Sequence, residues 1–151
     1  MTSTEELMKS APPTHYIKSW SGIVDPKDSS AVTKNSVWAQ LSQSEPHEPH
    51  FRLFGCMSGS KPFLMDVGAN CGQSIISFQA VASDASIRSF EPTPFSFQIA
   101  ERVAKIFPDV SVFNFGLSDR NTRLPIFTPV IDGLLVTPLT SLDPSAFEPG
   151  G

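Results

Sequence analysis

The stretch FLMDVGANCGQSIISF, residues 63–78, decides the fold of this chain. It begins as a short apolar run, passes through Gly68 and Gly72, and continues with apolar residues at helical spacing. A nearly continuous apolar run of this length is typical of a strand buried on both faces of a parallel sheet. We therefore expect a strand, a sharp turn and a helix in succession, with Asp66 just before the turn.

The same alternation continues along the chain. Residues 86–91 (SIRSFE) predict a second strand, and residues 110–115 (VSVFNF) predict a third. Between them, residues 93–107 predict a helix that begins at Thr93 as N-cap with proline in the first helical position. Two later extended pieces follow, separated by a turn at Asp132-Gly133. Strand, helix, strand, helix, strand at these spacings predicts an α/β fold with a doubly wound, mostly parallel, Rossmann-like sheet.

Composition divides the chain into two parts. Residues 1–60 are rich in Ser, Thr, Pro and charged residues, and we expect them to be largely disordered or irregular. Residues 61–151 carry the predicted domain.

The sequence has a net charge of −4 and no basic stripe, which argues against a nucleic-acid partner. No apolar run approaches the roughly 20 residues that span a bilayer, so we expect no membrane partner and, by default, a cytoplasmic location.

The N-terminal part offers little recognisable chemistry. Residues 30–43 could form a short helix, and the proline-rich stretch SEPHEPH at 44–50 is interpreted as a solvated linker. We expect His15, His47 and His50 to be solvated side chains, so no metal site and no catalytic base is predicted.

The two cysteines, Cys56 and Cys71, are expected to be free thiols, since an intracellular chain is usually kept reduced.

The glycine turn points to a bound small molecule. In a parallel α/β sheet, ligands bind beyond the carboxyl ends of the strands, where this turn is expected to lie. Gly68 permits a sharp bend, and Gly72 would let the backbone approach a ligand closely. A dinucleotide fingerprint, G-x-G-x-x-G, would place its second glycine at Asn70, and no glycine stands at 73. A pyrophosphate is therefore the weaker expectation.

An acid at the end of the second strand narrows the choice of ligand. Glu91 follows Gly72 by 19 residues. A carboxylate at this place accepts hydrogen bonds from both hydroxyls of a ribose, each of about 1.5 to 3 kcal/mol. These features indicate a nucleoside without strong phosphate contacts, and S-adenosylmethionine fits that description.

Three segments carry a family resemblance. FLMDVGANCGQ, SFEPTP and FNFGLSD, in this order and spacing, resemble the first signature segments of the FkbM family of S-adenosylmethionine-dependent methyltransferases. The resemblance covers roughly residues 62–143 and implies a class I methyltransferase fold, with methyl transfer to an oxygen of a sugar, polyketide or other small acceptor. It also implies cofactor contacts for nine residues, with methionine and ribose held by the first five, the ribose hydroxyls by the sixth and the adenine by the last three: Asp66, Gly68, Asn70, Gly72, Gln73, Glu91, Leu117, Ser118 and Asp119.

The family pattern would next supply a strand of the type Lys-Ile-Asp-x-Glu-Gly, whereas this sequence ends in EPGG. We therefore expect a domain truncated after the third strand and a following extended pair, and no turnover by the chain as given. The first strand would then have an open edge that could accept a partner strand. Two alternatives stay open: a fragment of a dinucleotide-binding oxidoreductase, and a non-catalytic half-domain that pairs with a partner.

Overall fold

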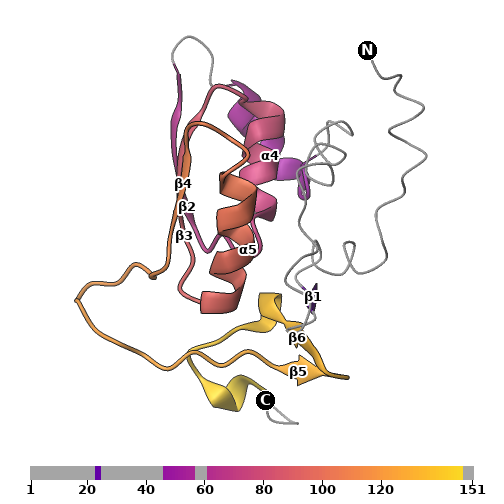
Figure 1. The fold of residues 1–151 in the computed structure, drawn as a ribbon, viewed down its shortest axis with the longest axis vertical. Helices are drawn as coiled ribbons and strands as arrows, with labels where there is room; N and C mark the ends of the chain where they lie inside the picture. Colours follow the sequence, from indigo (N-terminus) through magenta and orange to yellow (C-terminus); the bar gives the residue numbers. More distant parts are fainter. Residues whose placement is uncertain (1–22, 25–45, 57–60, 148–151) are drawn as a thin grey trace.

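The computed structural model describes residues 23–24, 46–56 and 61–147. This part of the chain is α/β, with one parallel sheet, two α-helices beside it and a small antiparallel sheet (Figure 1). The helix predicted at residues 30–43 lies outside the described residues.

The parallel sheet has the predicted order of elements. It consists of β2 (Phe63–Val67), β3 (Ser86–Phe90) and β4 (Val110–Phe113), with β3 in the centre. Both pairings are parallel. The carboxyl ends of the three strands therefore meet at one edge of the sheet, where the glycine turn follows β2.

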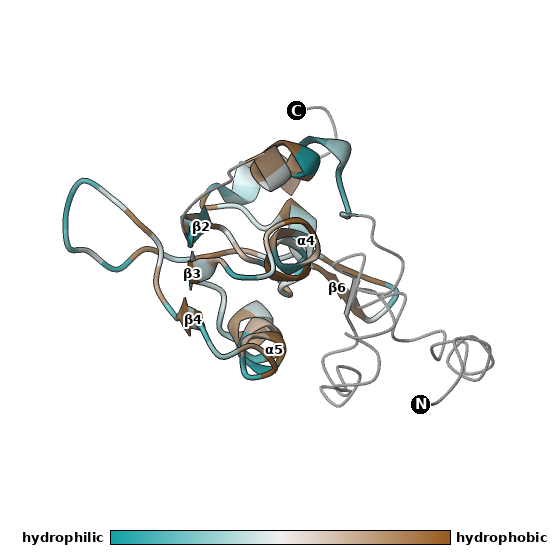
Figure 2. Cartoon of the chain, turned by 90° about the horizontal axis from the view of Figure 1, so that it is seen from above, coloured by the Kyte–Doolittle hydropathy of each residue, from teal (hydrophilic) through white to brown (hydrophobic). Residues whose placement is uncertain are grey.

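Two helices connect the strands and cover one face of the sheet. α4 (Gln73–Val81) links β2 to β3, and α5 (Pro94–Ala104) links β3 to β4. α5 begins as predicted, with Thr93 as N-cap and proline at the first position. Seen from above, both helices lie on the same side of the strands (Figure 2).

The core lies between these helices and the sheet. Its buried residues form two principal clusters, one between α5 and the start of α4 and one under the end of α4. Ile87 of the central strand β3 is fully buried, and Val110 of β4 packs against both clusters. Apolar burial thus attaches the helices to the sheet.

The second face of the parallel sheet is exposed, whereas the sequence predicts that it is buried. Leu64 and Asp66 are buried toward the helices, whereas Phe63, Met65 and Val67 are 60%, 59% and 62% exposed on the opposite face. The prediction that this strand is buried on both faces is therefore wrong for the described residues. The apolar composition is that of a covered strand, but no described helix lies over this face, and β2 is an edge strand.

The C-terminal part forms a small antiparallel sheet. β5 (Val130–Ile131) and β6 (Leu134–Val136) make a hairpin, and β1 (Ile23–Val24) pairs with the other side of β6. The predicted turn at Asp132-Gly133 is confirmed, and both residues adopt positive φ. The hairpin leads into the short 3-10 helix η3 (Thr137–Leu139), and η4 (Pro144–Phe147) follows.

Residues 46–56 pack onto the outside of α4. They include the 3-10 helix η2 (Pro49–Cys56), which buries Phe51 against Phe78 with ring centroids 4.9 Å apart. Residues 47–50 are exposed, as expected for a solvated linker. Pro49 and His50 nevertheless belong to η2, because prolines exclude an α-helix but not a 3-10 turn.

No helix in the described part of the chain is both long and apolar enough to cross a membrane.

Candidate functional site

The glycine turn is a strained bend attached to the end of β3. Gly68, Asn70 and Gly72 all have positive φ, at 91°, 48° and 90°. The backbone amides of Gly68 and Ala69 both donate to the carbonyl oxygen of Phe90, at 2.9 and 3.1 Å. The bend therefore lies against the carboxyl end of β3, at the position where α/β sheets bind ligands.

Glu91 lies directly against this bend. The backbone amide of Asn70 donates to Glu91 Oε2 at 2.8 Å, and the amide of Thr93 donates to Oε1 at 2.8 Å. Glu91 is 5% exposed, and it lines a cavity of about 270 Å³ together with Gly68, Asn70 and residues of the α5 N-terminus. The convergence of the bend and this acid, which the sequence predicted, is present in the structure.

Asp66 is held on the inner side of the bend. Two hydroxyls donate to its Oδ2, Ser74 Oγ at 2.7 Å and Ser89 Oγ at 2.9 Å. Ser89 lies opposite it in the register of β2 and β3. Burial raises the pKa of Asp66, and the hydrogen bonds from Ser74 and Ser89 act in the opposite direction. The Asp66 carboxyl group therefore links the end of β2 to the first turn of α4 through Ser74 and to β3 through Ser89.

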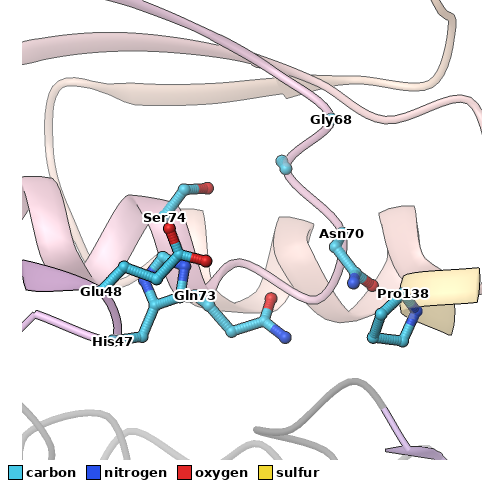
Figure 3. A pocket seen from close by; sticks show the side chains of 8 residues that line it. His47, Glu48, Gly68, Asn70, Gln73, Ser74 and Pro138 are labelled. Atoms are coloured by element: carbon cyan, nitrogen blue, oxygen red, sulfur yellow. The ribbon is translucent and has the colours of Figure 1, made fainter. Parts of the chain in front are cut away.

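A second cavity, of about 460 Å³, lies on the other side of the same bend (Figure 3). His47, Glu48 and Ser74 gather at one end of it, and Asn70 and Pro138 lie at the other. Three residues line both cavities: Gly68, Asn70 and Pro138. The two cavities are therefore neighbouring halves of one cleft that runs past the bend.

His47 is a cavity residue that sequence reasoning missed. Its Nδ1 lies 2.7 Å from Ser77 Oγ, and its backbone amide donates to the same oxygen at 3.0 Å. The residue as a whole is exposed, but its ring lies 4.7 Å from that of Phe51. Partial burial lowers the pKa of His47, although Glu48 favours the charged form. The pair Phe51 and Phe54, three apart, is the sequence signal that this segment packs.

The C-terminal part closes the cleft from the opposite side. Thr137 Oγ1 donates to Asn70 Oδ1 at 2.6 Å, and Pro138 and Thr140 line the cavity beside Glu91. Thr137, 67 positions after Asn70 in the sequence, thus orients the Asn70 side chain in the middle of the bend.

The two cysteines differ in burial. Cys71, next to Asn70, is buried, which raises the pKa of its thiol to about 11. Both cysteines are free thiols in the structure, as predicted.

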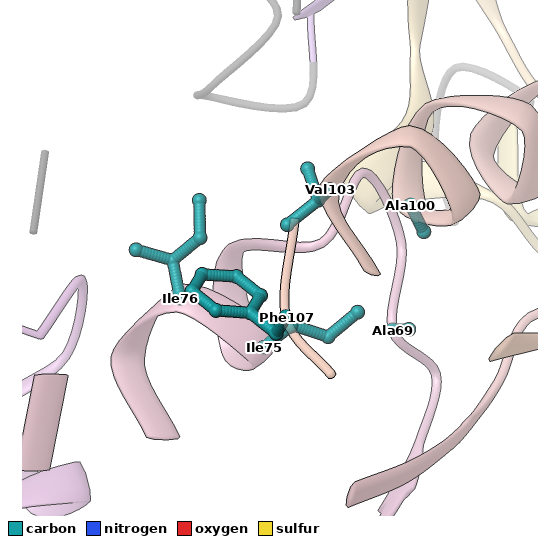
Figure 4. Packing of buried hydrophobic residues seen from close by; sticks show 6 residues of the cluster. All are labelled: Ala69, Ile75, Ile76, Ala100, Val103 and Phe107. Atoms are coloured by element: carbon teal, nitrogen blue, oxygen red, sulfur yellow. The ribbon is translucent and has the colours of Figure 1, made fainter. Parts of the chain in front are cut away.

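Gly72 serves the packing of the helices. It lines neither cavity. A Cβ added to it would lie 3.1 Å from Cβ and Cγ2 of Val103 and 3.4 Å from Cα of Ala100. Val103 lies in the apolar cluster between α4 and α5 (Figure 4). The close approach that Gly72 permits is therefore to α5. Gly68 faces open space instead, since nothing lies within 4 Å of its added Cβ.

The remaining site residues of the sequence analysis fall into two groups. Gln73 is buried and lines the larger cavity. Leu117, Ser118 and Asp119 lie in the loop after β4, are exposed and line neither cavity. Ser118 Oγ donates to Asp119 Oδ1 at 3.1 Å, which gives this loop a local turn of its own. The structure therefore brings together six of the nine residues around the bend and leaves the adenine contact of the other three a prediction.

The charge of the cleft is acidic. Glu48 and Glu91 line its two halves, and neither half is lined by a described lysine or arginine. Within the described residues, no group of three or more His, Cys, Asp or Glu side chains could hold a metal ion.

Comparison of the sequence and structure with family models, with curated proteins and with solved structures gave no match.

Proposed function

We propose that the cleft binds S-adenosylmethionine and that the chain belongs to a lineage of small-molecule O-methyltransferases. The observation that carries the proposal is the 2.8 Å hydrogen bond from the Asn70 amide to Glu91 Oε2. It places a buried carboxylate at the bend beyond the carboxyl ends of parallel strands, where a nucleoside sugar can reach it. The motif resemblance to FkbM methyltransferases supports the same ligand.

Glu91 has the capacity to hold a ribose. Each carboxylate oxygen has two lone pairs, and one backbone amide occupies one of them on each oxygen. The remaining lone pairs can accept the 2′ and 3′ hydroxyls of a sugar in the smaller cavity. Two such charge-assisted hydrogen bonds would contribute about 1.5 to 3 kcal/mol each.

The charges favour a sulfonium ligand over a dinucleotide. A pyrophosphate carries negative charge and is usually bound by backbone amides with a nearby cation. Here Glu48 and Glu91 line the cleft, and no described lysine or arginine does so. A positively charged sulfonium is attracted to this surface, whereas a pyrophosphate is repelled. The dinucleotide-binding oxidoreductase is therefore the weaker candidate.

In methyl transfer the protein acts mainly by orienting the two reactants, which can lower the activation barrier by about 7 to 11 kcal/mol. The bend, Gln73 and Ser74 are the groups placed to orient a ligand in the larger cavity. His47 is the imidazole placed to accept a proton from an acceptor hydroxyl there. If its Nδ1–H donates to Ser77, the lone pair of Nε2 is available for that transfer.

Isothermal titration calorimetry with S-adenosylhomocysteine and NAD tests the proposal. We expect S-adenosylhomocysteine to bind at least roughly tenfold more tightly, a difference of about 1.4 kcal/mol. Equal affinity, or tighter binding of NAD, would overturn the choice of ligand. Absence of binding by either ligand would overturn the nucleoside site altogether.

A further inference from the structure

The face of the parallel sheet that no described helix covers is largely apolar. In the strand register, Val67 lies opposite Phe90, and Phe90 lies opposite Phe113, so the three side chains share this face. Met65 and Phe63 extend the same face toward the amino end of β2. Figures 1 and 2 agree that α4 and α5 both lie on the other side of the strands. Parallel sheets are normally covered on both faces.

Aromatic rings gather at the carboxyl end of this face. The centroids of Phe90 and Phe113 are 5.4 Å apart in a stacked arrangement, and Phe115 lies 5.4 Å from Phe90 and 5.8 Å from Phe113. Phe113 is 38% exposed and Phe115 is 51% exposed. Aromatic side chains, including phenylalanine, are enriched in protein interfaces.

Among the described residues of β2, β3 and β4, Arg88 is the one charged side chain on this face, and its charge is directed away from the aromatic end. Arg88 of β3 shares the face with Met65 and Ser111. Its guanidinium donates to the backbone carbonyls of Ile87 and Asp109, at 2.9 and 3.2 Å. The described strand residues around Phe90 on this face are therefore apolar and place no like charges against an identical surface.

We propose that two copies of this chain associate face to face through this surface, which consists of Phe63, Met65, Val67, Phe90, Phe113 and Phe115. A fully exposed aromatic side chain offers on the order of 200 Å². At their observed exposures, the exposed side chains of this set offer roughly 500 Å² in each copy. Two copies would thus bury about 1,000 Å² of apolar area from side chains alone, which is the lower limit for a specific interface and fits a weak dimer.

The symmetry of such a pair follows from the placement of the charges. A two-fold axis close to Phe90 stacks the aromatic ends of the two sheets and keeps the two Arg88 side chains apart. Sheets pack face to face at about 10 Å, the distance that interdigitated side chains fill. Pairing through the open edge of β2 would instead leave Phe63, Met65 and Val67 exposed. Face-to-face packing therefore accounts for more of the exposed apolar area than edge pairing does.

Analytical ultracentrifugation of the full chain tests the proposal. We expect a closed dimer at concentrations in the range of tens to hundreds of micromolar. Met65→Glu puts a charge into the interface and should weaken the dimer roughly 10-fold, the effect of losing a contact away from the centre of the interface. Leu124→Glu is the matched control, because Leu124 is 56% exposed in the loop after β4, outside the sheet. This control should dimerise like the wild type.

Phe113→Ser is a second interface variant for the case in which Met65→Glu does not fold, with far-UV circular dichroism as the check on folding. A wild-type monomer at every concentration would overturn the proposal, as would open-ended assembly. A dimer that survives both substitutions would place the interface elsewhere, with the β2 edge the first candidate. These outcomes do not depend on whether the cleft binds S-adenosylmethionine.

Discussion

The backbone amide of Asn70, in the middle of a glycine bend, donates a 2.8 Å hydrogen bond to the carboxylate of Glu91, 21 positions further along the chain. The same carboxylate accepts the amide of Thr93, directly before α5. One buried acid thus joins the turn after β2 to the start of the second helix. The cleft on both sides of this bend is the part of the molecule best suited to hold a ligand.

The two bend glycines should respond differently to an added methyl group. Gly72→Ala should destabilise the protein by about 1 to 3 kcal/mol through crowding against Val103, in addition to left-handed strain. Gly68→Ala has only the strain, of about 1 to 2 kcal/mol, because its Cβ meets open space. Urea denaturation measures both. Equal losses would contradict the packing role of Gly72. In the control, Val103→Ala should relieve part of the Gly72→Ala loss.

Asp66 should make stability depend on pH with a definite sign. Burial raises its pKa above the ordinary 3.8, so the folded state binds its proton more tightly than the unfolded state does. Its contribution is fully present below pH 3.8 and is lost as pH rises through the folded-state pKa. The free energy of unfolding of the wild type, relative to Asp66→Asn, should therefore fall with rising pH in that window. Urea denaturation from about pH 3 to about pH 8 checks this.

Asp109→Asn is the control, because Asp109 should make the free energy of unfolding depend on pH with the opposite sign. The hydrogen bond and charge of Lys61 lower the pKa of Asp109, so its contribution is present above pH 3.8 and is lost as pH falls. A wild-type advantage over Asp66→Asn that grows with pH would contradict the burial of Asp66.

Much of the fold could be predicted because its signals are local. Apolar runs of strand length, helical spacing and the Thr93-Pro94 start mark the elements directly. The meeting of Glu91 with the bend could also be predicted, since parallel strands present their carboxyl ends at one edge.

The remaining features of the site depend on contacts between segments that lack a periodic pattern. His47 reaches Ser77 across 30 positions, and Thr137 reaches Asn70 across 67. Neither segment has a spacing that indicates its partner. The packing role of Gly72 depends on the approach of α5, and the exposure of Met65 depends on what covers the second face of the sheet. Apolar composition shows that a residue can be buried, but not which surface buries it.

Thr137 should matter to the cleft more than to the fold. Thr137→Val removes the donor to Asn70 Oδ1 and should cost about 1 kcal/mol of stability. It should also weaken S-adenosylhomocysteine binding several-fold, because Asn70 loses the contact that orients it. Ser145→Ala is the control, since it breaks the 2.8 Å hydrogen bond to Asp143 Oδ1 between two residues that line neither cavity. Calorimetry should show weaker binding for Thr137→Val than for Ser145→Ala, and the reverse order would exclude this role.

The two thiols should differ in reactivity. Cys71 is buried with its pKa raised to about 11, whereas Cys56 is exposed. A thiol reagent such as Ellman's reagent should therefore label one thiol in the native protein at neutral pH and two after denaturation. Cys56→Ser should abolish the native reaction. Rapid labelling of both thiols under native conditions would contradict the closed packing of Cys71 beneath η3.

Binding of S-adenosylhomocysteine and its 2′,3′-dideoxy analogue to the wild type and to Glu91→Gln tests the ribose site most directly. Calorimetry should show that loss of the hydroxyls weakens wild-type binding by roughly 10- to 100-fold, the effect of losing charge-assisted hydrogen bonds. Glu91→Gln should bind both ligands with nearly equal, low affinity. A wild type that does not distinguish the two ligands, or an undiminished preference in Glu91→Gln, would show that Glu91 does not hold the sugar.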